Sequence, residues 1–239
     1  AYVYSSTNGG LTWSEQLSVW RQNQTMKVED LYAESTGRVV ALVNHFPNIS
    51  QTYGYMYYSS DNGSNWDFTQ YTASGSISWD GMYTGTRSSG RYIIAGRDET
   101  IFTTTFFSNG SSTLQYQGND NGGYLMESMD ATGSSVVAVG NSLGGGHIYF
   151  SDDDGSNWTR RQVSGYTSTE FFGVVFAAEN TLEFFVAGSE GTLLHTLDGG
   201  LNWTRNSGVP STDDLLHVIY FGENNLLLTT NGGSVLIYR

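Results

Sequence analysis

The sequence predicts an all-β fold, a β-propeller with five blades of four antiparallel strands, in which the N- and C-terminal strands complete one blade. Three observations predict this fold: an eight-residue pattern recurs along the chain, its glycines are evenly spaced, and short β-rich runs flank each copy. The complete copies are residues 59–66, 151–158 and 196–203, and residues 6–13 form a fourth copy with Asn in place of Asp. Such a repeat indicates a repeating architecture.

All complete copies follow Ser/Thr-x-Asp-x-Gly-x-x-Trp, which we call the box. The interval from Gly155 to Gly200 is 45 residues, and the interval from Gly63 to Gly155 is 92, or two steps of 46. A degraded copy is therefore expected near residue 110. Residues 107–112 lie there, keep Gly110 and lack the tryptophan. The period thus covers most of the chain.

Each unit contains four short runs rich in β-branched and aromatic residues, bounded by Gly, Asn, Asp and Ser. Such runs are typical of strands joined by tight turns, and four strands in about 45 residues form one propeller blade. We expect a single domain whose units are roughly residues 1–23, 24–72, 73–118, 119–164, 165–208 and 209–239.

The two ends of the chain raise a second expectation. Two strands at the N-terminus, four in each of four complete units and three at the C-terminus give one strand more than a five-bladed ring needs. The spare strand, residues 2–5 or 234–238, could lengthen a blade or pair with a second copy of the chain, because an open sheet edge accepts another strand. A homo-oligomer and a segment cut from a longer propeller both remain open.

The box has a structural task between the third and fourth strands of a blade. Asp61, Asp153 and Asp198 are expected to accept backbone N–H hydrogen bonds, while the following glycine adopts a positive φ. The tryptophan then enters the outer strand with a large apolar face to bury. We therefore interpret the box as a turn rather than a binding site.

The boxes resemble the Asp-box, or BNR repeat, of sialidases, sortilin-type receptors, xyloglucan-active glycosidases and photosystem II assembly factors. The resemblance extends over essentially the whole chain, since every unit carries a box or its remnant. It implies a propeller fold. It does not select an activity, because those families include hydrolases, receptors and assembly factors.

Composition restricts the partners. Ten basic residues against 23 acidic ones give a formal charge of −13, which argues against nucleic acid or an anionic membrane surface as a partner. No stretch approaches the roughly 20 apolar residues of a membrane span, so no membrane insertion is expected. The absence of cysteine excludes disulfides and thiol chemistry. One lysine, abundant small polar residues and 16 tyrosines lead us to expect an extracellular, cell-surface or virion protein.

Hydrolysis of a glycoside is the alternative function. A sialidase would need an arginine cluster, a tyrosine nucleophile and an aspartic acid, and the Arg-Ile-Pro segment of sialidases is absent. Other glycosidases need two carboxylates across a cleft. Acidic residues at the starts of the innermost strands could supply them: Glu29, Asp30, Asp80, Glu127, Glu170, Asp213 and Asp214. No spacing selects a pair, so we assign no catalytic residue.

Binding is the function that we favour, for a carbohydrate or a protein ligand. Trp79, Asp80 and Tyr124 combine aromatic faces with a short polar group at one mouth of the central channel, and we expect them to form a ligand surface. The acidic segments 152–154 and 118–123 lack the ligand spacing of a calcium loop, so we expect no metal and no cofactor. A structural subunit of a filament or virion, assembled by strand exchange, is the third interpretation.

Overall fold

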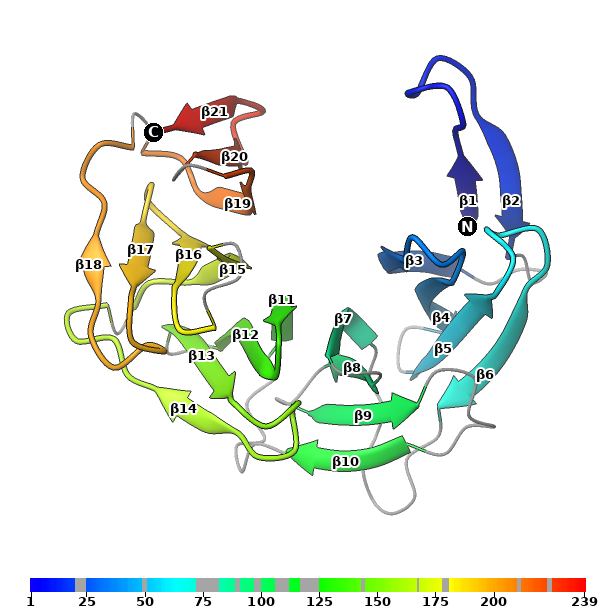
Figure 1. Cartoon of the computed structure of the whole chain (residues 1–239), viewed down its shortest axis with the longest axis horizontal. Helices are drawn as coiled ribbons and strands as arrows, with labels where there is room; N and C mark the ends of the chain where they lie inside the picture. Colours follow the sequence, from blue (N-terminus) through cyan, green and yellow to red (C-terminus); the bar gives the residue numbers. More distant parts are fainter. Residues whose placement is uncertain are drawn as a thin grey trace.

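The computed structural model describes residues 1–19, 25–48, 51–71, 82–88, 91–96, 100–105, 112–116, 125–142, 145–166, 168–177, 181–209, 212–222 and 225–239. All regular secondary structure in these ranges is β-strand, and they contain no helix that is long and apolar enough to cross a membrane. Six antiparallel sheets follow one another around a central space as an open crescent (Figure 1).

The first sheet, the terminal hairpin, consists of β1 (Tyr2–Ser5) and β2 (Ser14–Ser18). Blade 1 consists of β3 (Thr25–Ala33), β4 (Val39–Asn48), β5 (Gln51–Ser59) and β6 (Asp67–Tyr71). Blade 2 consists of β7 (Met82–Ser88), β8 (Arg91–Gly96), β9 (Ile101–Thr105) and β10 (Ser112–Tyr116). Blade 3 consists of β11 (Leu125–Thr132), β12 (Ser135–Ser142), β13 (Gly145–Ser151) and β14 (Thr159–Arg161). Blade 4 consists of β15 (Phe171–Phe176), β16 (Phe184–Gly188), β17 (Leu193–Thr196) and β18 (Thr204–Arg205). The terminal sheet consists of β19 (Leu215–Tyr220), β20 (Leu226–Thr230) and β21 (Val235–Tyr238).

In every blade the order of strands in space is their order in the chain. The first strands, β3, β7, β11, β15 and β19, line the central space, and β6, β10, β14 and β18 lie on the outside (Figure 1). This radial arrangement of antiparallel sheets is that of a β-propeller, and it confirms the predicted fold class. The part of the chain that the structure describes contains 21 strands, as two, four in each blade, and three.

The two ends do not complete one blade in this structure. The terminal hairpin and the terminal sheet face each other across the open side of the crescent, and β1 pairs with β2 while β21 pairs with β20 (Figure 1). In a complete blade the box follows the third strand, so β1, which precedes a box, occupies the position of a third strand. β21 comes after β19 and β20, so it occupies the same position in the terminal sheet. The two partial sheets therefore duplicate a position. Closure of the ring and the number of five blades stay predictions.

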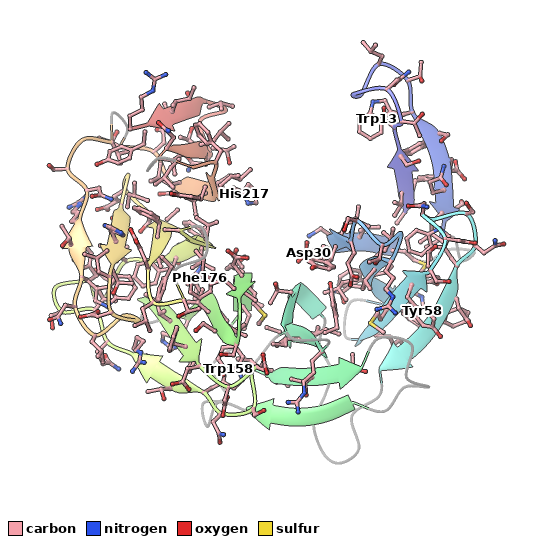
Figure 2. All side chains as sticks on the ribbon, in the orientation of Figure 1. Trp13, Asp30, Tyr58, Trp158, Phe176 and His217 are labelled. Atoms are coloured by element: carbon pink, nitrogen blue, oxygen red, sulfur yellow. The ribbon has the colours of Figure 1, made fainter. Side chains whose placement is uncertain are left out.

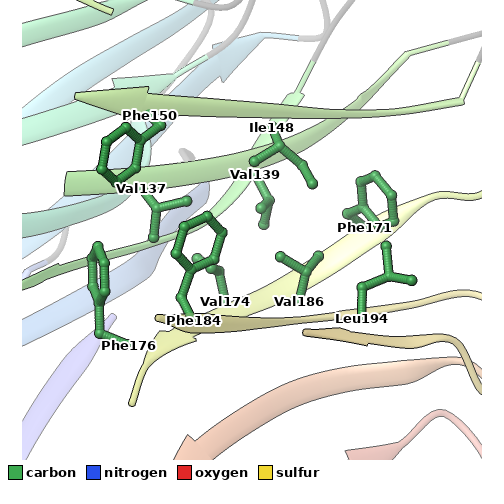
Figure 3. Packing of buried hydrophobic residues seen from close by; sticks show 10 residues of the cluster. All are labelled: Val137, Val139, Ile148, Phe150, Phe171, Val174, Phe176, Phe184, Val186 and Leu194. Carbon is green, nitrogen blue, oxygen red and sulfur yellow. The ribbon is translucent and has the colours of Figure 1, made fainter. Parts of the chain in front are cut away.

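The core lies between neighbouring blades, so the central strands are apolar on both faces. β12 and β16 are buried over almost their whole length. Figure 3 shows the buried cluster between blades 3 and 4, which includes Phe150, Phe176 and Phe184. The ring of Phe184 lies 6.0 Å from that of Phe150 and 5.5 Å from those of Phe176 and Trp203, which packs against the cluster. Interdigitated aromatic pairs of this kind fix the blade-to-blade distance.

The boxes form the turns that the sequence predicts. In blade 1, Asp61 Oδ1 accepts a hydrogen bond from Asn65 N at 2.8 Å, and Ser59 Oγ accepts one from Gly63 N at 2.9 Å. Gly63 has a φ of 85°, and Trp66 Nε1 donates to its carbonyl oxygen at 2.7 Å. Hydrogen bonds from Asn65 are the largest cause that lowers the pKa of Asp61, to about 2. The boxes of blades 3 and 4 repeat the Asp and Ser/Thr bonds.

Candidate functional site at the channel mouth

Each first strand carries one extra residue at the same place in its pairing with the second strand. The pairing register shifts between Val28 and Asp30 in blade 1, and the other four first strands shift at the corresponding position. The bulged residues are Glu29, Tyr83, Glu127, Phe172 and Leu216. Because a β-bulge bends its strand and re-aims a side chain, it is frequent at rims and beside functional sites. These five positions near the starts of the first strands define what we call the channel mouth.

The bulges were not recognised from the sequence, although a signal existed. Successive bulged residues from Tyr83 to Leu216 are 44, 45 and 44 residues apart, close to the period of the boxes. Their residue types differ from blade to blade, so no motif marks them. A constant position with varied chemistry is what a ring of ligand-contacting residues would show.

Blades 1 and 3 use the same polar arrangement at the mouth. Asn44 Nδ2 donates a hydrogen bond to Glu29 Oε1 at 3.2 Å, and Glu127 is likewise hydrogen-bonded to the side chain of Asn141. Each asparagine lies on the second strand of its blade, opposite the residue two positions before the bulged glutamate. Asn141 Oδ1 also accepts a hydrogen bond from Phe171 N at 2.6 Å, which ties the site in blade 3 to blade 4.

Acidic charge from three blades meets at this mouth. Partial burial raises the pKa of Glu127, the hydrogen bond from Asn141 opposes that shift, and the charge of Glu170 adds to it. The charges of Lys27 and Glu29 in blade 1 act on Glu127 as well, Lys27 lowering its pKa and Glu29 raising it. Lys27 Nζ lies 2.5 Å from Glu29 Oε2. The carboxylates therefore outnumber the cation that they share.

The bulged residues of blade 4 and of the terminal sheet are apolar. The bulged residues Phe172 and Leu216 of blade 4 and the terminal sheet are half-buried. The next residue after the bulge in β19 is His217, which is exposed and projects toward the central space (Figure 2). A mouth with carboxylates on one side and apolar side chains on the other suits a polypeptide segment that carries both basic and apolar residues.

The structure tests only part of the predicted site. Trp79, Asp80 and Tyr124 lie outside the described residues, so their role as a ligand surface stays a prediction. Of the acidic residues at strand starts, Glu29 and Glu170 lie near enough to Glu127 for their charges to raise its pKa.

Two other members of that acidic pool, Asp214 and Asp30, accept hydrogen bonds from neighbouring protein groups. Asp214 Oδ1 accepts a hydrogen bond from Glu190 N at 3.1 Å and Asp214 Oδ2 accepts one from Asn231 Nδ2 at 2.9 Å. Asp30 Oδ1 accepts one from Leu31 N at 2.8 Å. These contacts hold loops and strand edges in place.

Within the described ranges, no group of three or more His, Asp or Glu side chains is placed to hold a metal ion. In the acidic segment 152–154, Asp153 accepts hydrogen bonds from Ser151 Oγ, Asn157 N and Asn157 Nδ2. The segment 118–123 lies outside the described residues.

Comparison with known proteins identifies relatives. The family model of photosynthesis system II assembly factor YCF48 matches residues 3–239. A curated relative, the photosystem II assembly lipoprotein Ycf48 of Synechococcus sp. (strain CC9902), is 32% identical over 87 residues, which is 35% of this chain and 25% of that protein. The match thus spans a quarter of the relative. It contradicts the expected extracellular, cell-surface or virion location, because the relative is a lipoprotein that assembles photosystem II.

Solved structures share the fold. YCF48 from Cyanidioschyzon merolae is 17% identical with a TM-score of 0.69, covering 100% of this chain and 74% of that one. A YCF48 bound to D1 peptide is 16% identical with a TM-score of 0.57, covering 99% and 84%. An α-L-arabinanase from Penicillium chrysogenum, also 16% identical, gives 0.60 over 99% and 83%. Likeness at this identity extends to a hydrolase as readily as to an assembly factor, so it speaks for the fold alone.

Proposed function

This chain belongs to the photosystem II assembly factor YCF48 family, and we propose that it is a non-catalytic module that binds a polypeptide segment of a photosystem II component at the channel mouth. The family supplies the assembly role. The observation that supports the location is the row of bulged residues, which are acidic in blades 1 and 3 and apolar in blade 4 and the terminal sheet.

The chemistry of the mouth favours a peptide over a sugar. A peptide with basic and apolar side chains would pair its cations with Glu127 and Glu170 and its apolar groups with Phe172 and Leu216. Electrostatic complementarity of this kind sets orientation and speeds association. A relative in the family has been solved with a D1 peptide, which supports a peptide as the class of ligand.

Binding of a fluorescently labelled D1 peptide, measured by anisotropy, tests the proposal. We expect Glu127→Gln and Phe172→Ala each to weaken binding about tenfold, the effect of losing roughly 1.4 kcal/mol of interaction. Glu15→Gln on β2 removes the same charge from an exposed position on the terminal hairpin and should leave the affinity unchanged.

Three results would refute this location. The affinity of both mouth variants could equal that of the wild type, or Glu15→Gln could weaken binding equally, which would mean that only net charge matters. Capture of a neutral oligosaccharide in competition with the peptide would favour a carbohydrate ligand instead. Circular dichroism of each variant confirms that the fold is intact.

A further inference from the structure

A pocket of about 370 Å³ opens beside the box of blade 1, at the end of β5 and the start of β6. Its lining consists of Tyr58, Ser59, Ser60, Asn65, Trp66 and Asp67. The pocket belongs to the outer half of the blade, and Figure 2 shows Tyr58 well away from Asp30, which lies beside the central space. It is therefore separate from the channel mouth.

One cross-strand pair of the pocket differs in its chemistry from the equivalent pairs beside the boxes of blades 3 and 4. Tyr58 pairs with Asp67 in blade 1, whereas the corresponding pairs are Phe150 with Thr159 in blade 3 and His195 with Thr204 in blade 4. The turn framework is the same in all three. Blade 1 alone among these has a phenol and a carboxylate at this position, so the shared turn does not require them.

The phenol and the carboxylate are coupled. Tyr58 donates a hydrogen bond to Asp67, and Asp67 Oδ1 also accepts one from Phe68 N at 2.9 Å. A carboxylate offers about four acceptor positions, so Asp67 retains acceptors for a ligand. The Tyr58 hydroxyl fixes the direction in which they point.

The other polar groups of the lining also favour a ligand that donates hydrogen bonds. Asn65 uses its Nδ2 to donate to Asp61 Oδ2 at 2.6 Å, which leaves Asn65 Oδ1 as the acceptor of that amide. Among the lining residues that the structure describes, none carries a basic side chain. A group with several donors and no acceptor, carrying a positive charge, is complementary to this set.

At the corresponding position of blade 3, a guanidinium group of the protein itself lies against an aromatic ring. The guanidinium carbon of Arg161 lies 5.1 Å from the ring centroid of Phe150, and Arg161 Nε donates to Gly199 O at 2.7 Å. Arg161 stands two residues after Thr159, and the corresponding residue of blade 1 is Thr69. Blade 1 therefore keeps the aromatic residue, gains a carboxylate and lacks the internal arginine.

We propose that the pocket of blade 1 binds an arginine side chain of a protein partner, with the guanidinium against Tyr58 and hydrogen-bonded to Asp67. Arginine fits better than lysine because its planar group can stack on a ring and bond to a carboxylate with two donors at once. The site goes beyond the channel mouth, and it relies on the proposed function only for the source of the arginine.

The test uses acetyl-Gly-Arg-Gly-amide as the probe, titrated into the whole chain and followed by NMR chemical shifts or calorimetry. Citrulline in place of arginine keeps the shape and removes the charge, and we expect it to bind at least tenfold more weakly. Asp67→Asn and Asp67→Thr should each weaken arginine binding about tenfold, and Tyr58→Phe about threefold.

The matched control is Asp152→Asn, which removes one exposed charge from the box of blade 3 and should leave binding unchanged. Equal affinity for the citrulline peptide, no effect of Asp67→Asn, or an equal effect of Asp152→Asn would overturn the proposal, as would displacement of the arginine peptide by a neutral oligosaccharide. The tripeptide contains no photosystem sequence, so failure of the channel-mouth proposal would not alter this result.

Discussion

Removing the hydroxyl of Ser151 should destabilise the protein far more than the same change at Ser6. Ser151 is 2% exposed, its Oγ accepts a hydrogen bond from Gly155 N at 3.0 Å, and it donates to Asp153 Oδ1 at 2.8 Å. In Ser151→Ala the buried Gly155 N–H loses its acceptor, which costs about 1–3 kcal/mol, and the lost bond to the carboxylate adds about 1 kcal/mol. We expect the free energy of unfolding to fall by about 2–4 kcal/mol.

Ser6 makes the corresponding contact in the exposed box of the terminal hairpin, where its Oγ accepts from Gly10 N at 2.8 Å. Water can replace the hydroxyl there, so Ser6→Ala should cost less than about 1 kcal/mol. Urea denaturation of both variants measures the difference, and Ser151→Thr, which imitates Thr196 of blade 4, should retain most of the stability. Equal losses for Ser151→Ala and Ser6→Ala would refute the reasoning, because burial would then have no part in the effect.

Three further predictions concern acid, packing and the mouth. The pKa values of Asp61 and Asp198 are lowered to about 2, so their stabilising effect is complete above about pH 4 and is lost as the pH falls toward 2. A variant with Asn at both positions should therefore lose less stability than the wild type when both are titrated with acid. Phe184→Ala should cost about 3–5 kcal/mol in urea denaturation, whereas Phe172→Ala at the half-buried mouth should cost clearly less, and similar values would contradict the assigned core. The raised pKa of Glu127 means that its ionisation opposes folding. Ionisation of Glu127 between pH 4 and 7 should lower the stability of the wild type, and Glu127→Gln should not show this part of the decrease.

The turn of the box was predictable because it depends on contacts between residues that are close in the sequence. The box predicts its own turn, since the Asp61 acceptor, the positive φ of Gly63 and the Trp66 indole all act within eight residues. The strand runs and their period likewise predict four-stranded blades and the number of strands. Composition did not predict location, because a preference for small polar residues is shared by proteins of many compartments.

The candidate site was less predictable. The sequence named the acidic residues at strand starts as a pool, and it did not show that the charges of Glu29 and Glu170 would act on Glu127. Neither did it show that the Tyr58 and Asp67 pair would line a pocket. Trp79 was selected as an aromatic residue near a strand start, and its place stays a prediction.

The sequence by itself determined the turn chemistry of the box, because the hydrogen bonds of the box join residues within eight positions, and the β-propeller class, because the box and the strand runs that flank it recur along the chain. Only the tertiary structure decided which side chains meet across blades. A bulge of one residue reverses the direction in which the following side chains point, and Asn141 reaches Phe171 thirty positions away. Such contacts depend on the twist and packing of whole sheets, so the channel mouth and the unpaired ends of the crescent became visible only in the folded chain.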